Sequence, residues 1–277
     1  MLRIEHTTRF TYAGPVASSY NEARMEPVTN ERQRVLEARL NVEPVSWTHR
    51  YLDYWGAAVT AFEVLAPHDG LVIRAESLVE VTDPEPDLPD ATWDELDEPA
   101  LRDELAEHLG GSDVTSAPPD LARIAGEVAE GRTPGEAAVA LCAALRDEVE
   151  YVPGVTTVHT PAADAWAART GVCQDMAHLA IAALRSIGIP ARYVSGYLHH
   201  GSSQEIGVAV VGESHAWVEY WVGRWVGYDP TNRVPVGERH VVLARGREYA
   251  DVAPLTGVYD GPGTSGLDVE VRITRVG

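Results

Sequence analysis

The stretch of sequence that decides the fold covers residues 169–190 and reads RTGVCQDMAHLAIAALRSIGIP. Four of its apolar side chains recur at the three- and four-residue spacing of an α-helix: Met176, Leu179, Ala183 and Ile187. Gly188 and Pro190 then supply the stop signal that is typical of a helix C-terminus. The pattern therefore predicts a helix whose first turn carries Cys173.

Cys173 is the candidate nucleophile because of its predicted place at the start of this helix. The first N–H groups of a helix lack intrahelical partners and the helix dipole favours negative charge there, so a thiolate is stabilised. We interpret Gly171 as leaving room for a substrate to approach the sulfur. The other cysteine, Cys142, falls in a second predicted helix, which opens at Pro134 and runs through residues 137–149. Its small apolar neighbours predict a buried, unreactive thiol.

A thiol nucleophile needs a base, and two adjoining predicted strands offer one together with a carboxylate that could orient it. Residues 213–222 read ESHAWVEYWV, and the strand begins at His215. Residues 225–232 read WVGYDPTN, and this second strand ends at Asp229. The order Cys, His, Asp along the chain therefore favours nucleophilic catalysis by a thiol.

The register of this hairpin decides whether His215 and Asp229 can meet, because side chains alternate between the two faces of a strand. A two-residue loop would turn Asp229 to the face opposite His215. A three-residue loop at residues 222–224 places Asp229 opposite Trp217, diagonal to His215 and on the same face. We therefore predict a three-residue or bulged hairpin.

The rest of the chain divides into three predicted parts, and the fold class that follows is α+β. Residues 1–82 alternate short β-type runs with turns, which predicts a small β-sandwich. Residues 83–118 begin with an acidic, proline-rich stretch that is typical of a connector and continue with helical turns. Residues 119–277 hold the predicted catalytic core. The β-type runs cover residues 9–12, 37–42, 59–64 and 71–74.

Composition excludes several classes of function. The chain has 277 residues with 42 acidic and 22 basic side chains, and its net charge of −20 repels a phosphate backbone, so nucleic acid binding is not expected. No lysine occurs, which excludes lysine Schiff-base chemistry and P-loops. The two cysteines form neither a disulfide framework nor a zinc pattern, and no EF-hand motif is present, so we expect no cofactor and no metal.

Neither a metal site nor a membrane segment is indicated elsewhere. The pair His199-His200, with Ser202 and Ser203 after it, lacks a carboxylate or thiol at ligand spacing, and we interpret both histidines as solvent-exposed bystanders. The charged N-terminus does not resemble a signal peptide, and the longest apolar stretch, residues 179–184, is too short to cross a membrane. We therefore expect a cytoplasmic protein without a membrane partner.

Five short motifs follow one another along the predicted core: GVCQD at 171–175, GIPAR at 188–192, YVSGY at 193–197, HAW at 215–217 and DPTN at 229–232. In this order they resemble the bacterial transglutaminase-like superfamily. The β-rich N-terminal segment and residues 244–254 also resemble the bacterial branch. The resemblance implies a papain-like α+β core in which Cys173 is the nucleophile, His215 is the general base and acid, and Asp229 orients the imidazole.

The resemblance also implies the chemistry. A peptide, protein or amide substrate would form a thioester at Cys173, which water resolves in a protease or amidase and an amine co-substrate resolves in a transferase. The residues leave the choice between water and amine open. The alternative is a catalytically silent binding module with the same fold. The sequence indicates no oligomeric state.

The residues that complete an oxyanion hole are less defined. The N–H of Cys173 at the helix start is one expected donor. Papain-like proteases add a glutamine shortly before the cysteine, where this chain has alanines, and animal transglutaminases add a tryptophan, for which Trp166 and Tyr151 are the candidates here. Trp217 is a candidate for lining an acyl-substrate groove, with core packing as the alternative, and we expect His178 to be a core histidine.

Overall fold

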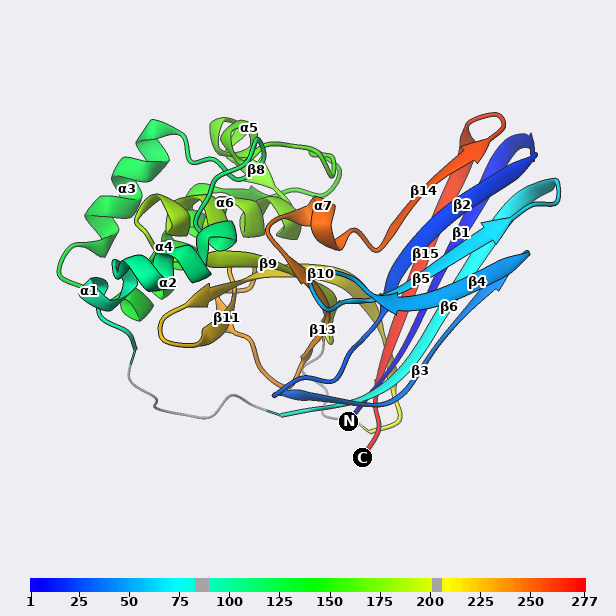
Figure 1. The fold of residues 1–277 in the computed structure, drawn as a ribbon, viewed down its shortest axis with the longest axis horizontal. Helices are drawn as coiled ribbons and strands as arrows, with labels where there is room; N and C mark the ends of the chain where they lie inside the picture. The colour runs from blue at the N-terminus through cyan, green and yellow to red at the C-terminus, as the bar shows by residue number, and fades with distance from the viewer. Residues whose placement is uncertain (83–89, 201–205) are drawn as a thin grey trace.

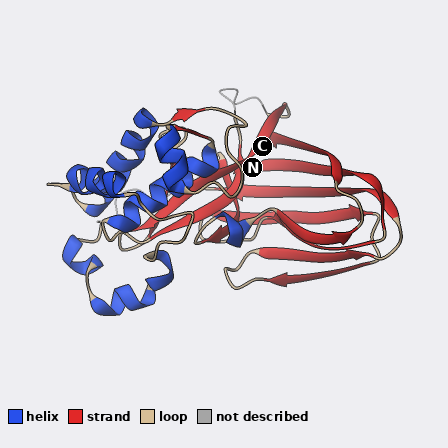
Figure 2. Ribbon diagram, turned by 90° about the horizontal axis from the view of Figure 1, so that it is seen from above, coloured by secondary structure: helices blue, strands red, loops and turns tan. Residues whose placement is uncertain are grey.

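The protein is described by a computed structural model that covers residues 1–82, 90–200 and 206–277. Its class is the predicted α+β: the helices gather at one end of the molecule and a β-sandwich extends from the other (Figure 1). Figure 2 shows the same division from above, with long strands running from the helical end into the sandwich. The two chain ends lie side by side, and the N–H of Val276 donates to the carbonyl of Met1 (3.0 Å).

The predicted sandwich consists of two facing layers of antiparallel strands. The first layer has the order β3–β6–β1–β15, with bounds β3 (Gln33–Glu43), β6 (His68–Val81), β1 (Leu2–Val16) and β15 (Thr264–Arg275). The second layer has the order β14–β2–β5–β4, with bounds β14 (Leu255–Asp260), β2 (Ser18–Glu26), β5 (Ala58–Val64) and β4 (Trp47–Leu52). Each of the four predicted β-type runs lies within one of these strands.

Alternating side chains on the two layers form the sandwich core. Phe62 and Val64 of β5 meet Leu71 and Ile73 of β6, and all four are almost completely buried. A sheet with one buried face requires such alternation. Burial of each aliphatic or aromatic side chain contributes about 1.5–3 kcal/mol to the free energy of folding.

The C-terminal residues depart from the predicted three-part division. Residues 255–277, which the sequence placed in the catalytic core, instead supply β14 and β15, which pair with β2 and β1 of the sandwich. A two-residue alternation predicts that a strand exists but not which strand it pairs with, so partners far apart in the chain escape this kind of reasoning.

One long strand joins the sandwich to the catalytic part. In β10 (Ala209–Trp221), the first four residues pair with β15, and residues from Glu213 to Tyr220 pair with β9 (Ala191–Leu198). The remaining strands of the catalytic part are β7 (Glu150–Tyr151), β8 (Thr170–Gly171), β11 (Trp225–Asp229), β12 (Val234–Pro235) and β13 (His240–Gly246). The shared strand joins the two parts in one continuous sheet, which has nine strands among the residues that the structure describes.

The helices pack on this sheet and around one central helix. Their bounds are α1 (Trp93–Leu96), α2 (Pro99–Glu104), the 3₁₀ helix η1 (Ala106–His108), α3 (Pro119–Ala129), α4 (Pro134–Glu148), α5 (Ala162–Ala168), α6 (Cys173–Ser186) and α7 (Tyr249–Val252). α1, α2 and η1 are the helical turns predicted for the connector, whose residues 83–89 lie outside the described residues. Helix α6 lies at the centre and contacts α3, α4, α5, β9 and β10. In the described ranges, no helix has the length and apolarity needed to cross a bilayer.

Both predicted helices begin and end as their local sequences indicate. Thr133 caps α4 by accepting from the N–H of Glu136 (3.3 Å), while the Glu136 carboxylate accepts from the N–H of Thr133. Gly188 has a φ of +84°, a left-handed conformation that follows α6 and favours glycine. Cys142 is fully buried in α4, and burial raises the pKa of its thiol to about 12, as expected of an unreactive cysteine.

Candidate active site

Cys173 is the first residue of α6, as predicted, and a buried carboxylate organises this helix start. Oδ2 of Asp175 accepts from the N–H of Val172 (2.7 Å) and from the hydroxyl of Thr156 (2.6 Å). A carboxylate in the first turn also complements the positive end of the helix dipole. Asp175 therefore ties the turn that carries the sulfur both to the residue before it, Val172, and to the preceding loop at Thr156.

Gly171 serves this turn rather than the approach of a substrate, which corrects our interpretation of the sequence. A Cβ at Gly171 would lie only 2.7 Å from the Cβ of Asp175, so a larger residue would displace the side chain that caps α6. Gly171 also pairs with Tyr151 in the short parallel ladder between β8 and β7. Backbone packing accounts for the glycine.

His215 and Asp229 meet through the predicted three-residue hairpin. Trp221 pairs with Trp225, which leaves residues 222–224 as the loop, and the register places Asp229 opposite Trp217. The N–H at Nε2 of His215 donates to Oδ2 of Asp229 at 2.8 Å. The register prediction is confirmed, and both side chains are buried.

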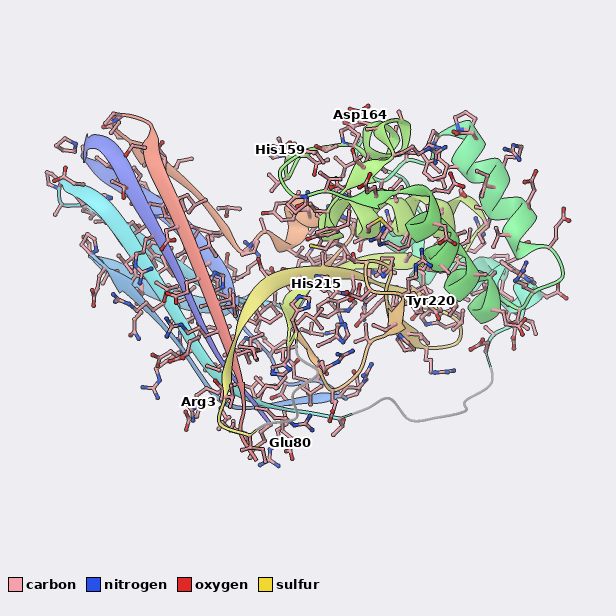
Figure 3. The ribbon with its side chains drawn as sticks, turned by 180° about the vertical axis from the view of Figure 1, so that it is seen from behind. Arg3, Glu80, His159, Asp164, His215 and Tyr220 are labelled. Carbon is pink, nitrogen blue, oxygen red and sulfur yellow. The ribbon has the colours of Figure 1, made fainter. Side chains whose placement is uncertain are left out.

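Cys173 completes a line of three side chains. Its half-buried sulfur hydrogen-bonds to the His215 ring, and because Nε2 is used by Asp229, Nδ1 is left for the sulfur. Burial alone would lower the pKa of His215, but the hydrogen bonds and charges of Asp229 and Cys173 overcome it and raise the pKa to about 9. At neutral pH the ring is therefore an imidazolium next to the sulfur, near the middle of the molecule (Figure 3).

Asp229 accepts hydrogen bonds from several donors besides His215. Its Oδ1 accepts from the N–H groups of Thr231 (3.0 Å) and Asn232 (3.1 Å), and its Oδ2 accepts from the side-chain amide of Asn232 (2.7 Å). Burial opposes ionisation, but these donors and the two histidines hold the pKa of Asp229 well below its usual range. The DPTN motif contained this signal, because an aspartate often accepts from backbone N–H groups two and three residues later.

A second histidine, His240 on β13, also donates to Asp229. The N–H of Gly237 donates to Nδ1 of His240 (3.3 Å), so the ring proton of the neutral form lies on Nε2, which donates to Oδ2 of Asp229 (3.3 Å). The His240 ring is buried and packs edge-on against Trp217, 5.2 Å between centroids. No local sequence signal marks His240 as a site residue, since only the pairing of β13 with β9, and of β9 with β10, brings it to the site.

The structure separates the three candidates for the oxyanion and substrate roles. Trp166 donates its indole N–H to Asp120 (2.7 Å) and its ring is covered by a guanidinium, so this candidate is wrong as an oxyanion donor. Tyr151 is half-buried and pairs with Gly171, two residues before Cys173, so it remains a candidate.

Trp217 packs in the core and does not line a groove. The side chain is completely buried, and its indole packs against Gly196. A Cβ at Gly196 would lie only 2.4 Å from the indole ring. Its neighbours in this small cluster are Val194, Val236 and Val242. Of the two roles considered for Trp217, the structure therefore supports core packing.

The other histidines differ from the expectation in one case. His178 is a core histidine, as predicted: its Nε2 accepts from the N–H of Tyr249 (3.2 Å), and burial lowers its pKa to about 4. His200 is exposed, but His199 is buried, so the expectation that both are solvent-exposed is wrong for His199. Pairing of β13 with β9 covers this strand end, and the N–H of His199 donates to the carbonyl of Arg239. Ser202 and Ser203 lie outside the described residues.

Comparison with known proteins shows the family that the sequence motifs resemble. Residues 122–230 match the Transglutaminase-like superfamily, and residues 2–80 match the Bacterial transglutaminase-like N-terminal region. An uncharacterized protein of Mycobacterium leprae is 43% identical over 275 residues, which is 99% of both chains. A Pseudomonas aeruginosa protein named protein-glutamine gamma-glutamyltransferase is 35% identical over 134 residues, 42% of this chain and 20% of that protein.

A solved structure shares the whole fold. The crystal structure described as that of "a Putative Cysteine Protease from Cytophaga hutchinsonii" superimposes with a TM-score of 0.76 at 23% identity, and the match covers 98% of this chain and 90% of that one. The likeness therefore includes the sandwich and its connection to the catalytic part.

Proposed function

The chain belongs to the transglutaminase-like superfamily, and from that premise we propose that it is a cysteine enzyme that forms a thioester at Cys173 from a peptide or amide substrate. The observation that carries the proposal is the hydrogen-bonded line from Cys173 through His215 to Asp229. In this line the nucleophile, the base and the group that orients the base are all in contact.

The first half of the reaction uses the charged pair of Cys173 and His215. The thiolate attacks the amide carbonyl carbon, a C–S bond forms, and the carbonyl electrons move to the oxygen. The N–H of Cys173, which has no intrahelical partner at the first position of α6, is placed to donate to that oxyanion. When the C–N bond breaks, the imidazolium of His215 gives its proton to the leaving amine, and the acyl group remains as a thioester.

The second half reverses the roles. A water molecule gives a proton to the neutral His215 and attacks the thioester, which releases a carboxylic acid and restores the thiolate. An amine that attacks in place of water yields a new amide by the same proton transfer. Asp229 holds Nε2 throughout, so Nδ1 always faces the sulfur and the incoming group.

Two named relatives correspond to these two outcomes. The Pseudomonas aeruginosa protein bears the name of a gamma-glutamyltransferase, an enzyme that transfers an acyl group, and the Cytophaga hutchinsonii structure is described as that of "a Putative Cysteine Protease". Both outcomes share the thioester, so the choice between them depends on which nucleophile reaches it. The shared intermediate is the part that the site geometry supports.

The activated thiol is tested by measuring the rate at which iodoacetamide labels Cys173 between about pH 5 and pH 9, with mass spectrometry to locate the label. The buried Cys142 serves as the internal control, and His215→Ala is measured alongside. We expect fast labelling of Cys173 that persists at low pH and falls in the variant. Labelling no faster than that of a free thiol, unchanged in His215→Ala, would favour the silent binding module.

The two ways of resolving the thioester are then distinguished with an acyl donor in the presence and absence of a primary amine. A carboxylic acid product that does not change as amine is added identifies a protease or amidase. An amide product that grows with amine concentration identifies a transferase.

A further inference from the structure

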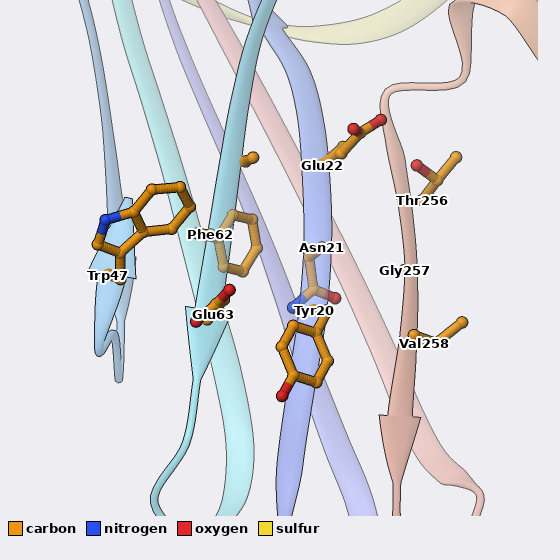
Figure 4. Close-up of a pocket in the computed structure, with 10 residues that line it drawn as sticks. Tyr20, Asn21, Glu22, Trp47, Phe62, Glu63, Thr256, Gly257 and Val258 are labelled. Atoms are coloured by element: carbon orange, nitrogen blue, oxygen red, sulfur yellow. The ribbon is translucent and has the colours of Figure 1, made fainter. Parts of the chain in front are cut away.

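The outer face of the second sandwich layer carries a row of side chains that the catalytic site does not use. Across β2, β5 and β4, the register places Tyr20 beside Glu63, and Glu63 beside Trp47. These three residues line a groove that continues over Val258 of β14. Figure 4 shows the Glu63 carboxylate between the two aromatic rings.

The spacing of this row suits a cation. Neighbouring strands lie about 4.8 Å apart, so the backbones that carry Tyr20 and Trp47 are roughly 10 Å apart, with the carboxylate midway between them. An ammonium or guanidinium group placed over Glu63 would lie between the Tyr20 and Trp47 side chains, where the carboxylate and nearby aromatic rings both attract a cation. The two rings are half-exposed, Tyr20 at 49% and Trp47 at 50%.

Glu63 differs from its acidic neighbours because nothing in the described residues neutralises it. Glu22 accepts from the hydroxyl of Tyr51 (2.6 Å) and from Arg24, and Glu26 pairs with Arg50 (2.7 Å). For Glu63, no ion pair or side-chain hydrogen bond occurs with any residue in the described part of the chain. A carboxylate flanked by two rings is thus left for an external partner.

The outer face of the first layer shows the contrasting arrangement. There, arginines pair with acidic residues of the adjacent strand: Arg9 with Asp268, Arg39 with Glu76 and Arg74 with Glu43. Arg3 on β1 also lies 3.9 Å from Glu37 on β3, across the intervening β6. That face pairs most of its arginines with carboxylates of the chain, whereas the face with Glu63 places an uncompensated carboxylate between two aromatic side chains.

The strand that carries Trp47, β4, has an open edge. Within the described residues, β4 pairs only with β5, and all six of its side chains are exposed. Trp47, His49 and Tyr51 stack along its outer face, with centroids 5.7 and 6.2 Å apart. An unpaired strand edge offers backbone donors and acceptors to another extended segment.

We propose that Tyr20, Glu63 and Trp47 form a binding slot for the arginine or lysine side chain of an extended, basic polypeptide segment that lies along β4. Backbone pairing at the β4 edge would hold the segment, and its long cationic side chain would reach across the Trp47 ring to Glu63. The net charge of −20 favours a basic partner over a second copy of this chain. The slot uses no residue of the Cys173 site and goes beyond the proposed reaction.

The test uses a capped peptide of alternating threonine and valine with one central arginine, and the same peptide with the neutral isostere citrulline in its place. Binding is measured by titration calorimetry to the Cys173→Ala protein, in which turnover cannot interfere. We expect the arginine peptide to bind at least about fivefold more tightly than the citrulline peptide, and the difference to shrink as salt is raised.

Matched variants test the named residues. Glu63→Gln and Trp47→Leu should each weaken binding of the arginine peptide about fivefold or more. Glu5→Gln, which removes an exposed carboxylate on the outer face of the first layer, should leave the affinity for this peptide unchanged. All three positions are at least partly exposed, and thermal unfolding checks that the variants fold.

Three results would overturn the proposal. Equal binding of the arginine and citrulline peptides, or unchanged binding in Glu63→Gln, would show that no cation occupies the slot. Self-association seen by sedimentation and lost in Trp47→Leu would show that a second copy of the chain covers this face.

Discussion

Replacing Asp229 with asparagine removes the charge that keeps His215 protonated, and the structure indicates how large the effect should be. Burial lowers the pKa of His215, yet Asp229 and Cys173 together raise it from 6.5 to about 9. That rise corresponds to roughly 3 kcal/mol in favour of the charged ring. In Asp229→Asn the charge is lost while the burial remains, so we expect the pKa of His215 to fall to 6.5 or below.

The sign of the pH dependence follows from the raised pKa. Protonation of His215 stabilises the fold fully below about pH 6.5, and this contribution is lost as the pH rises through about 9. The wild-type protein should therefore lose up to roughly 3 kcal/mol of unfolding free energy across this window from His215. The Asp229→Asn protein should lose much less across the same window.

Two measurements check this prediction. NMR titration of ¹³Cε1-labelled histidines, with His215→Ala to assign the resonance, reports the pKa of the ring directly. Urea unfolding at both ends of the window reports the stability, with the buried-thiol variant Cys142→Ala as a control for damage to the core that leaves His215 and Asp229 in place. If the His215 pKa stayed near 9 in Asp229→Asn, the charge of Asp229 would not be what holds the imidazolium.

The remaining predictions concern residues that support the site. His240→Leu removes a buried donor to Asp229 and should lower the free energy of unfolding by about 1–3 kcal/mol, with His240→Gln partly restoring it, as urea unfolding would show. Asp175→Ala removes the cap of α6 and should lower the free energy of unfolding by about 0.5–2 kcal/mol. It should also slow iodoacetamide labelling of Cys173. Equal labelling rates in the variant and the wild type would contradict the role given to the cap. Gly171→Ala should lower the free energy of unfolding by about 1–3 kcal/mol because the added Cβ meets Asp175. At Gly126 in α3 an added Cβ meets nothing within 4 Å, so Gly126→Ala should leave the melting temperature unchanged or raise it.

Local signals in the sequence located most of the site. The start of α6 at Cys173 follows from apolar spacing and a glycine stop, and the contact of His215 with Asp229 follows from counting loop residues in a short hairpin. Each of these features depends on residues that are close in the chain, so spacing and turn length are enough to predict them.

Features that depend on distant pairing were missed or misassigned. His240 reaches Asp229 only because β13 pairs with β9, and β15 joins the sandwich only because it pairs with β1. Trp166 has the residue type of an oxyanion donor, but Asp120 on another helix takes its N–H. Nothing in the local sequence indicates which strand edge or which side chain a distant segment will meet.

The central claim is that Cys173 becomes acylated, and the most direct measurement is to trap that acyl group. The protein is mixed with the activated ester of a capped peptide, quenched in acid within the first turnover, digested and examined by mass spectrometry. We predict an acyl adduct on Cys173 that hydroxylamine releases as a hydroxamate, that forms equally in Cys142→Ala, and that forms far more slowly in His215→Ala. An adduct absent from Cys173, or one that forms at the same rate without His215, would contradict the account.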